Sequence, residues 1–480
     1  MVAETDTFCP AERRRYALLA AIVASAMGFI DGSVVTLAIP AMRESLAASL
    51  TEAQWINNAY MLPLSALMLV GGASGDRFGL RRVFGLGIVA FVIASLLCAV
   101  APSAETLILA RVVQGVAAAF MVPGSLALIS KVYPPGERGR AIGIWAASSA
   151  MTTAIGPVLG GALLSLGDPE LWRIVFAMNL PVGALAIYWL WGKVPADEGQ
   201  PTGPLDIPGA VLATLALGAL AWALTGPEGE GSGPTAAHLT LFGLLGLALM
   251  AAFLMVERRA AHPMMPLRLF AVGRFSVANA ITFAIYFALA AVMFYLPTTL
   301  IAGWGVSPGA VGLLFMPLTI AIALGSGPAG RLSERVGPGP LIAAGAGVLA
   351  LGYGALAAGI GLQSFWGHVL PVMIATGVGM ALVVAPLSTA VMGAVGDGDS
   401  GAASGINNAV SRMAGLIAVA ALGTLVAAGY AGAGGPESFG LPSDAPGHAA
   451  ASGAGFAGVA WLAASLCAVS SGLAAFGLRR

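Results

Sequence analysis

Long apolar runs separated by short polar segments dominate the pattern of this chain. A helix needs about 20 apolar residues to cross the hydrocarbon of a bilayer, and fourteen stretches reach that length. Gly and Pro within them are compatible with helices, because neighbouring helices can satisfy the freed backbone groups. We therefore expect an all-α polytopic membrane protein whose spans cover approximately residues 16–39, 52–73, 82–101, 105–130, 139–165, 172–192, 207–226, 237–257, 275–300, 308–329, 339–361, 367–392, 401–428 and 454–477.

Composition agrees with this pattern. The chain is 58% hydrophobic and 9% charged, whereas soluble domains usually carry about 25% charged residues. Three cysteines and four histidines show no ligand spacing, so we expect no metal site, disulfide framework or cofactor. No phosphate-binding GxxxxGK[ST] loop is present, so ATP is not expected to drive the protein. No feature of the sequence suggests a nucleic-acid partner. The sequence also lacks the catalytic dyad that an intramembrane enzyme would need.

The placement of the basic residues predicts the orientation. With the N-terminus in the cytoplasm, all but four of the 22 basic residues fall in inner segments. The exceptions are Arg43 and Arg173 in outer loops, and Arg111 and Arg412 inside spans. This asymmetry follows the positive-inside rule. We expect a multi-pass protein of the inner (plasma) membrane with both termini cytoplasmic.

An internal repeat divides the chain. The segment 72–79, GASGDRFG, recurs as 330–337, GRLSERVG. We expect a cytoplasmic tail (1–15), a six-helix bundle (16–192), a linker with two extra transmembrane helices (193–274) and a second six-helix bundle (275–480). Repeated halves around a site near the midplane are typical of transporters.

Several motifs resemble those of the major facilitator superfamily, in particular its fourteen-helix drug:proton antiporter group. GASGDRFGLRR at 72–82 resembles the signature between helices two and three, and LILARVVQGVAAA at 107–119 resembles the helix-four signature. TTAIGPVLGG at 152–161 resembles the antiporter signature of helix five, with Thr152 where Gly is usual. The stretches 29–40, 172–183 and 404–415 resemble further patterns of the group. The resemblance implies two pseudo-symmetric six-helix halves plus two central helices.

The resemblance and the residues together give candidate sites. The repeated segment implies a cytoplasmic gate in which Asp76 or Glu334 docks on the opposite half; the alternative is a positive-inside anchor only. Gating residues would be Gly72, Asp76, Arg77, Gly79, Arg81, Glu334 and Arg335. The helix-five residues are Gly156, Pro157, Gly160 and Gly161; they imply export, or serve only for close packing.

Asp31 is the only acidic residue that we place deep in a span. An ionisable group there costs roughly 2.5–3.5 kcal/mol on insertion scales, so it needs a partner or a function. Arg111 lies at matching depth, about two turns from the outer end of its helix, and Gln114 is one turn away. The three residues form a proton-coupling site, or Asp31 and Arg111 form a purely structural ion pair.

Other polar groups are candidates for a substrate cavity. Arg412 would bond Asn407 or Asn408, reach Asp31, or meet an anionic group of the substrate. Asn57, Asn58, Trp145 and Tyr286 line the cavity or pack between helices. Glu257, beside Arg258 and Arg259, is expected to be a solvated anchor at the inner interface.

The sequence thus predicts a proton-coupled secondary transporter that exports small hydrophobic or amphiphilic compounds by alternating access. Its partners would be a small-molecule substrate, protons and the lipid bilayer, and a monomer is expected. Export of a lipid or amphiphilic metabolite, with the extra helices as a lateral entrance, is the alternative. A membrane sensor that does not transport a substrate is the third, remote alternative.

Overall fold

A computed structural model describes residues 8–199, 205–226, 234–261, 263–396 and 399–478. Within these residues, fourteen helical segments are long and apolar enough to cross a membrane, as predicted. The sixth is split at Met178, so the spans comprise fifteen α-helices: α1 (Ala11–Leu46), α2 (Leu50–Phe78), α3 (Leu80–Ala99), α4 (Ala104–Val132), α5 (Pro135–Leu164), α6 (Trp172–Ala177), α7 (Asn179–Lys193), α8 (Ile207–Thr225), α9 (Ala236–Arg259), α10 (Gly273–Thr298), α11 (Pro308–Val336), α12 (Pro338–Gly359), α13 (Leu370–Met392), α14 (Ser400–Gly432) and α15 (His448–Gly477).

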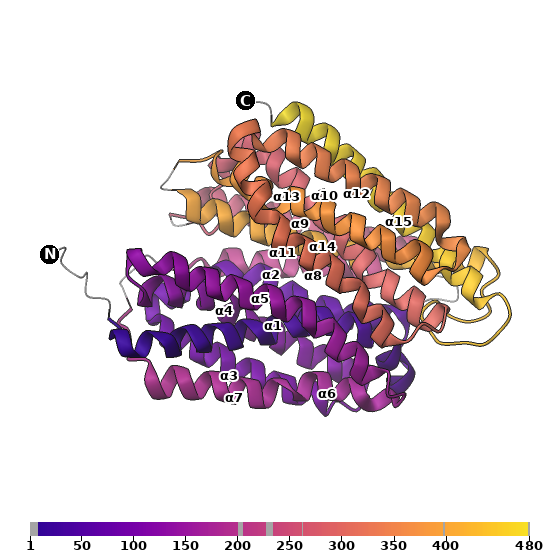
Figure 1. Cartoon of the computed structure of the whole chain (residues 1–480), viewed down its shortest axis with the longest axis horizontal. Coiled ribbons are helices and arrows are strands. Elements are labelled where there is room, and N and C mark those ends of the chain that lie inside the picture. Colours follow the sequence, from indigo (N-terminus) through magenta and orange to yellow (C-terminus); the bar gives the residue numbers. More distant parts are fainter. Residues whose placement is uncertain (1–7, 200–204, 227–233, 262, 397–398, 479–480) are drawn as a thin grey trace.

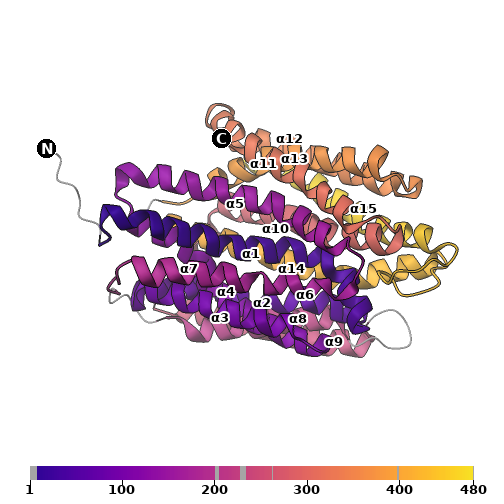
Figure 2. The same cartoon turned by 60° about the horizontal axis from the view of Figure 1, so that its bottom comes forward.

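The helices form two groups that lie against each other (Figure 1). Helices α1–α7 pack among themselves, and so do α10–α15. The extra pair, α8 and α9, lies to one side, where α8 contacts α2 of the first group and α14 of the second (Figure 2). The pair therefore covers the α2–α14 contact on that side of the bundle, instead of leaving an opening there.

Local sequence signals explain where helices begin. Ser49 precedes α2, and its hydroxyl accepts the backbone N–H of Glu52 at 3.1 Å while the Glu52 carboxylate accepts the Ser49 N–H at 2.8 Å. This reciprocal capping box satisfies two backbone donors that the helix itself cannot. Ser103 and Thr106 form the same arrangement at the start of α4.

The repeated segments form matching turns. Helix α2 ends at Gly79 with φ +89°, and α11 ends at Gly337 with φ +87°. In both places the next helix begins at once, at Leu80 and Pro338. Only glycine adopts this backbone conformation without strain, so the two turns require the glycines that the repeat places there.

We call the end at which α1 begins and α2 ends the basic end, because most arginines and lysines lie there; the other is the far end. Apolar packing between the halves is continuous at the far end. One cluster joins Val35 and Met42 of α1 to Tyr295 and Leu296 of α10, whereas a separate cluster fills the basic end of the first half alone. The halves accordingly converge toward the far end and diverge toward the basic end (Figure 1).

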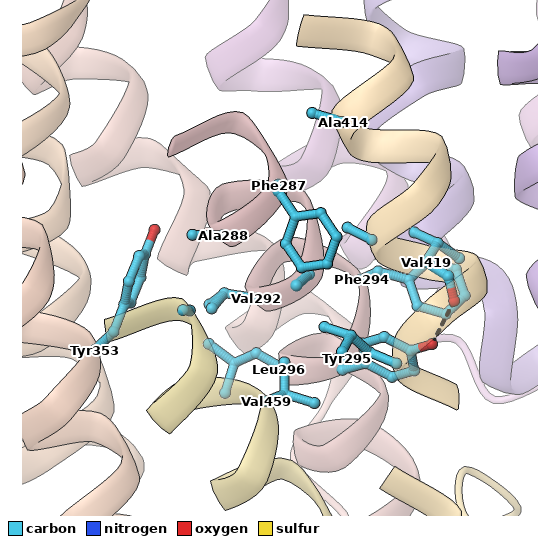
Figure 3. Close-up of a cluster of buried hydrophobic side chains, with 14 of the residues drawn as sticks. Phe287, Ala288, Val292, Phe294, Tyr295, Leu296, Tyr353, Ala414, Val419 and Val459 are labelled. Carbon is cyan, nitrogen blue, oxygen red and sulfur yellow. Dashed lines mark hydrogen bonds between the residues drawn. The ribbon is translucent and has the colours of Figure 1, made fainter. Parts of the chain in front are cut away.

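Helix α10 forms the centre of the second half. Its side chains Phe287, Phe294 and Tyr295 lie among residues of α12, α14 and α15 (Figure 3). The Tyr295 hydroxyl donates to the Val419 carbonyl at 2.7 Å, and the Gln54 amide of α2 donates to the same carbonyl at 2.5 Å. One backbone oxygen of α14 thus ties α10 and the first half together at the far end.

Helix α1 extends beyond the predicted span 16–39 at both ends, from Ala11 to Leu46, so the expectation that Arg43 lies in an outer loop is wrong. Arg43 therefore lies in its last turn instead of in a loop, and it is only 1% exposed. Its guanidinium donates to the Phe439 carbonyl and to the Ser438 hydroxyl of the loop before α15. This bonding explains how an arginine is buried at the far end.

Close contact between α5 and α11 holds the halves together at the far end. A Cβ added to Gly312 would lie 2.3 Å from the Pro157 carbonyl oxygen, and one added to Gly161 would lie 2.4 Å from the Pro308 carbonyl oxygen. Toward the basic end of α5, a Cβ on Gly143 would meet nothing within 4 Å. The same helix is therefore tightly packed at one end and uncovered at the other.

We expect Gly312→Ala to weaken the far-end contact, because the added methyl overlaps backbone. Overpacking of this kind costs about 1–3 kcal/mol. The thermal unfolding midpoint of the purified protein should fall, and a cysteine introduced near Ser165 should react faster with a membrane-impermeant maleimide. Gly143→Ala is the matched control and should behave as wild type. Equal midpoints for both variants would contradict this packing.

Candidate functional site

A buried ion pair lies at the centre of the first half. Arg111 of α4 donates through Nη1 to Oδ2 of Asp31 on α1 at 2.6 Å. Their side chains are 1% and 0% exposed. Helix α1 is longer than predicted, so Asp31 lies about four turns from its end. The two residues still meet, since α1 extends further than α4 at the far end.

Gln114 completes the pair and extends it. Its carbonyl accepts the same Arg111 Nη1 at 2.6 Å, and its amide donates to Oδ1 of Asp31 at 3.0 Å. The amide also donates to the Ser95 hydroxyl of α3 at 3.0 Å, and Asn179 of α7 donates to that hydroxyl at 3.2 Å. Residues of α1, α3, α4 and α7 thus share one buried polar network.

The remaining faces of Arg111 are also occupied. Its Nε donates to the Ile56 carbonyl of α2 at 3.0 Å. The guanidinium lies 4.3 Å from the ring centroid of Tyr60 and 5.6 Å from that of Phe176. Aromatic faces attract a desolvated cation, so these rings replace part of its lost hydration.

Sequence reasoning missed Ser95, Asn179, Tyr60 and Phe176 as parts of this network. Asn179 and Phe176 belong to the motif at 172–183, so a signal existed for these two. Ser95 carried none, because a serine in an apolar helix ordinarily bonds its own backbone.

Arg412 is the second charge within the spans, and its surroundings differ from those of Arg111. It is partly exposed on α14, and its guanidinium makes no hydrogen bond or ion pair with the residues that the structure describes. Asn407 instead accepts from Thr282, and Asn408 donates to the Ser404 carbonyl. Of the contacts anticipated for Arg412, those with the asparagines and with Asp31 are therefore not formed.

Two tyrosines, one from each half, lie near Arg412. Tyr60 of α2 and Tyr286 of α10 are close enough to act electrostatically on its guanidinium. Tyr60 also covers the guanidinium of Arg111, so this ring lies near both cations. Tyr286, a predicted cavity residue, thus lies near Arg412, and Tyr60 links Arg412 to the Asp31–Arg111 pair.

The other cavity candidates have mixed placements. Asn57 donates to Asn58 at 3.4 Å, and the amide nitrogen of the fully buried Asn58 has no partner among the described residues. Trp145 donates to the Ser25 hydroxyl at 3.0 Å and packs beside Ala21, so it joins α5 to α1. The placement of Trp145 is therefore explained by packing between α5 and α1.

The loop at the basic end of α2 is held by a residue that the sequence did not reveal. Asp197, in the segment after α7, accepts the backbone N–H groups of Leu80 and Arg81 at 2.9 and 2.8 Å and pairs with Lys131 at 2.6 Å. Burial opposes ionisation, but these hydrogen bonds outweigh it and hold the pKa of Asp197 below its usual value. The carboxylate caps the start of α3, where the helix dipole favours a negative charge.

The charged gate residues are placed around this cap. Arg81 donates to the carbonyls of Leu190 and Trp191. Asp76 is exposed at the end of α2 and makes no hydrogen bond or ion pair with a described residue, so the docking on α14 is absent from this conformation. A hydrated carboxylate needs no protein partner. Arg77, Glu334 and Arg335 are exposed, and Gly72 lies beside Pro123.

The helix-five glycines face two different helices. A Cβ on Gly160 would lie 2.1 Å from a methyl of Val34 on α1, and one on Gly156 would lie 3.4 Å from the Ser33 hydroxyl. Gly161 and Pro157 face α11, as described above. Helix α5 is thus wedged between the helix that carries Asp31 and the opposite half.

Two groups of membrane-spanning helices, the first of which encloses a buried charge network, define a polytopic membrane transporter. A model of the Major Facilitator Superfamily matches residues 21–419. The chain is 34% identical over 87% of its length to the puromycin resistance protein pur8 of Streptomyces alboniger, covering 82% of that protein. It is 32% identical over 85% of its length to the multidrug resistance protein Stp of Mycobacterium tuberculosis, covering 76% of it. The chain belongs to the Major Facilitator Superfamily.

Solved structures agree on the fold. A bacterial homologue of the human lysosomal transporter Spinster, in an inward-facing and unoccupied conformation, superposes with a TM-score of 0.69 at 19% identity, over 98% of both chains. A D-xylose–proton symporter superposes with a TM-score of 0.65 at 14% identity, over 97% of this chain and 98% of that one. As a member of the Major Facilitator Superfamily, the protein is a membrane transporter of small molecules and not an enzyme.

Asp31→Asn should destabilise the protein, because it leaves the Arg111 charge buried without its counterion. Removing one partner of a buried pair costs about 3–5 kcal/mol. Adding Arg111→Gln to Asp31→Asn removes the orphaned charge, and the double variant should unfold at a higher temperature than the single one. Asp444→Asn, at an exposed carboxylate, is the control. Additive losses in the double variant would contradict the pairing.

Proposed function

We propose that the protein is a proton-coupled exporter of small hydrophobic or amphiphilic compounds. The observation that carries this proposal is the buried Asp31–Arg111–Gln114 network, which contains a titratable carboxylate at membrane depth. Intramembrane acids of this kind mark ion and proton pathways. The named functions of the relatives, resistance to puromycin and to multiple drugs, support export as the direction.

Coupling would proceed through exchange of the Asp31 partner. In the present conformation Arg111 and Gln114 bind the carboxylate, which is closed off from solvent. A proton entering from the outside would neutralise Asp31 and release Arg111. Return of Arg111 would expel the proton toward the cytoplasm. Each step moves one proton at the carboxylate and breaks or forms the pair with Arg111.

The basic end is proposed to face the cytoplasm of the cell's inner membrane, because a positive-inside orientation requires it. Helix α5 is packed tightly against α11 at the far end and is uncovered toward the basic end, which then corresponds to an inward-facing state. Asp76 and Glu334 would latch the basic end when the halves close there. Each chain encloses its own site between its two halves, which supports a monomer as the working unit.

Arg412 is proposed to contact the substrate. Its guanidinium has no hydrogen-bond partner among the described residues, and one tyrosine of each half, Tyr60 and Tyr286, lies near it. A substrate with an apolar body and one anionic or acceptor group would suit a cation that no described protein group binds. Lipid export is less well supported, because α8 packs against both α2 and α14 and leaves no entrance there.

Asp31→Asn should abolish drug accumulation driven by a pH gradient, since the amide cannot carry the proton. Inside-out vesicles with an acidic interior and labelled puromycin provide the assay, with Asp444→Asn as the control. Binding of puromycin without a gradient should persist. Unchanged gradient-driven accumulation by Asp31→Asn would exclude Asp31 as the coupling residue.

Arg412→Gln should discriminate between charged and uncharged substrates. For a xanthene dye with a free carboxylate, the half-saturating concentration should rise about tenfold or more, because a charge-assisted hydrogen bond is lost. The ester of the same dye should be affected much less. Arg412→Lys keeps the charge but not the planar fork, so its effect should be intermediate. Equal changes for acid and ester would contradict a direct contact.

A further inference from the structure

Glu257 lies in the last turn of α9, and the expectation that it is solvated is wrong. The residue is only 3% exposed, whereas its neighbours Arg258 and Arg259 are exposed. The helix thus turns the carboxyl group inward and both cations outward. A buried carboxyl group without a cation needs another way to satisfy its oxygens.

The partner of Glu257 is a second acid. Asp206 caps the start of α8, where its Oδ1 accepts the backbone N–H of Gly209 at 2.9 Å. Glu257 Oε2 accepts the backbone N–H of Met265 at 3.1 Å. The remaining oxygens, Asp206 Oδ2 and Glu257 Oε1, are both buried and have no hydrogen-bond donor among the described residues.

The two carboxyl groups lie within hydrogen-bonding reach of each other. Two ionised carboxylates repel strongly at such a separation, and both would leave a buried oxygen without a donor. A single proton between them satisfies both oxygens at once, because a protonated carboxyl is a donor. We propose that Asp206 and Glu257 form a proton-binding site, separate from Asp31, in which the two carboxyl groups share one proton.

Among the described residues, no other charged group near this end neutralises the two carboxyl groups in place of the shared proton. Asp206 is the charged residue that acts on Glu257 among the described ones. Arg268, in the segment that leads to α10, is engaged by Asp399 in a two-pronged ion pair at 2.8 and 2.6 Å. Asp76 of α2, the helix packed against α8, is exposed. Arg412 of α14 lies further within the span.

The position of the pair gives the proton a structural effect. Asp206 ends the connection from the first half, and Glu257 begins the connection to the second half, which it holds through Met265. The protonated pair joins the start of α8 to the end of α9. Loss of the proton places two like charges together and separates these ends. Protonation thus clamps the connection between the two halves.

Thermal unfolding of the full-length protein tests the site without reference to transport. A proton held more tightly in the folded state stabilises less as pH rises, so the wild-type midpoint should fall from about pH 4.5 to about pH 7 and level off above that. Glu257→Gln supplies a permanent donor to Asp206 and still accepts from Met265, so its midpoint should depend less on pH. Glu437→Gln, at an exposed carboxylate, should follow wild type.

Asp206→Asn provides a second variant that keeps the helix start intact, because Asn caps helices as well as Asp. It should also flatten the pH profile. Hydrogen exchange of the Met265 amide, corrected for intrinsic rates, should show wild-type protection falling at high pH and protection retained in Glu257→Gln. Wild-type pH profiles in both variants, or protection of Met265 that is independent of pH in wild type, would overturn the proposal.

Discussion

The burial of one ion pair constrains the architecture of the first half. Moving a carboxylate and a guanidinium out of water carries a penalty of several kcal/mol per ion, which mutual attraction offsets only when the remaining polar atoms are also satisfied. Gln114, Ser95 and the Ile56 carbonyl provide those bonds. Because they come from different helices, the pair fixes how α1, α2, α3 and α4 can pack. A shift of any of these helices would leave a buried polar atom without a partner.

Small residues form the contact between the two halves, whereas the charged network lies within one half. Glycines of α5 and α11 allow backbones to touch at the far end, where apolar packing is continuous. In a bilayer such contacts depend on van der Waals packing, because lipid is as apolar as the helices. The charged network stays within one half, so rocking at this interface leaves it intact.

Much of the fold could be predicted from the sequence, because span length and the placement of arginines reflect the bilayer directly. The number of spans, the repeat at 72–79 and the approach of Arg111 to Asp31 all followed from patterns along the chain. Helix ends were less predictable. Arg43 was assigned to a loop because a charge ordinarily ends a span, yet backbone carbonyls of a distant loop satisfy it.

The parts that sequence reasoning missed depend on contacts between distant segments. Asp197 and Glu257 lie beside polar or basic residues and resemble solvated charges in the sequence. Their burial arises from the return of a linker onto a helix end, which no local pattern encodes. Likewise, Ser95 enters the network only because α3 and α4 bring it beside Gln114.

The isolation of Arg412 has an electrical consequence. Asp31 and Arg111 move as a neutral unit, and the repeat places Leu289 where a matching acid would stand in the second half. Arg412 is therefore an uncompensated charge on α14 within the membrane field. Moving one charge through the whole field involves about 2.3 kcal/mol per 100 mV. Any displacement of α14 along the membrane normal changes the electrostatic energy of the empty carrier in proportion, so membrane voltage biases which conformation the unloaded protein adopts.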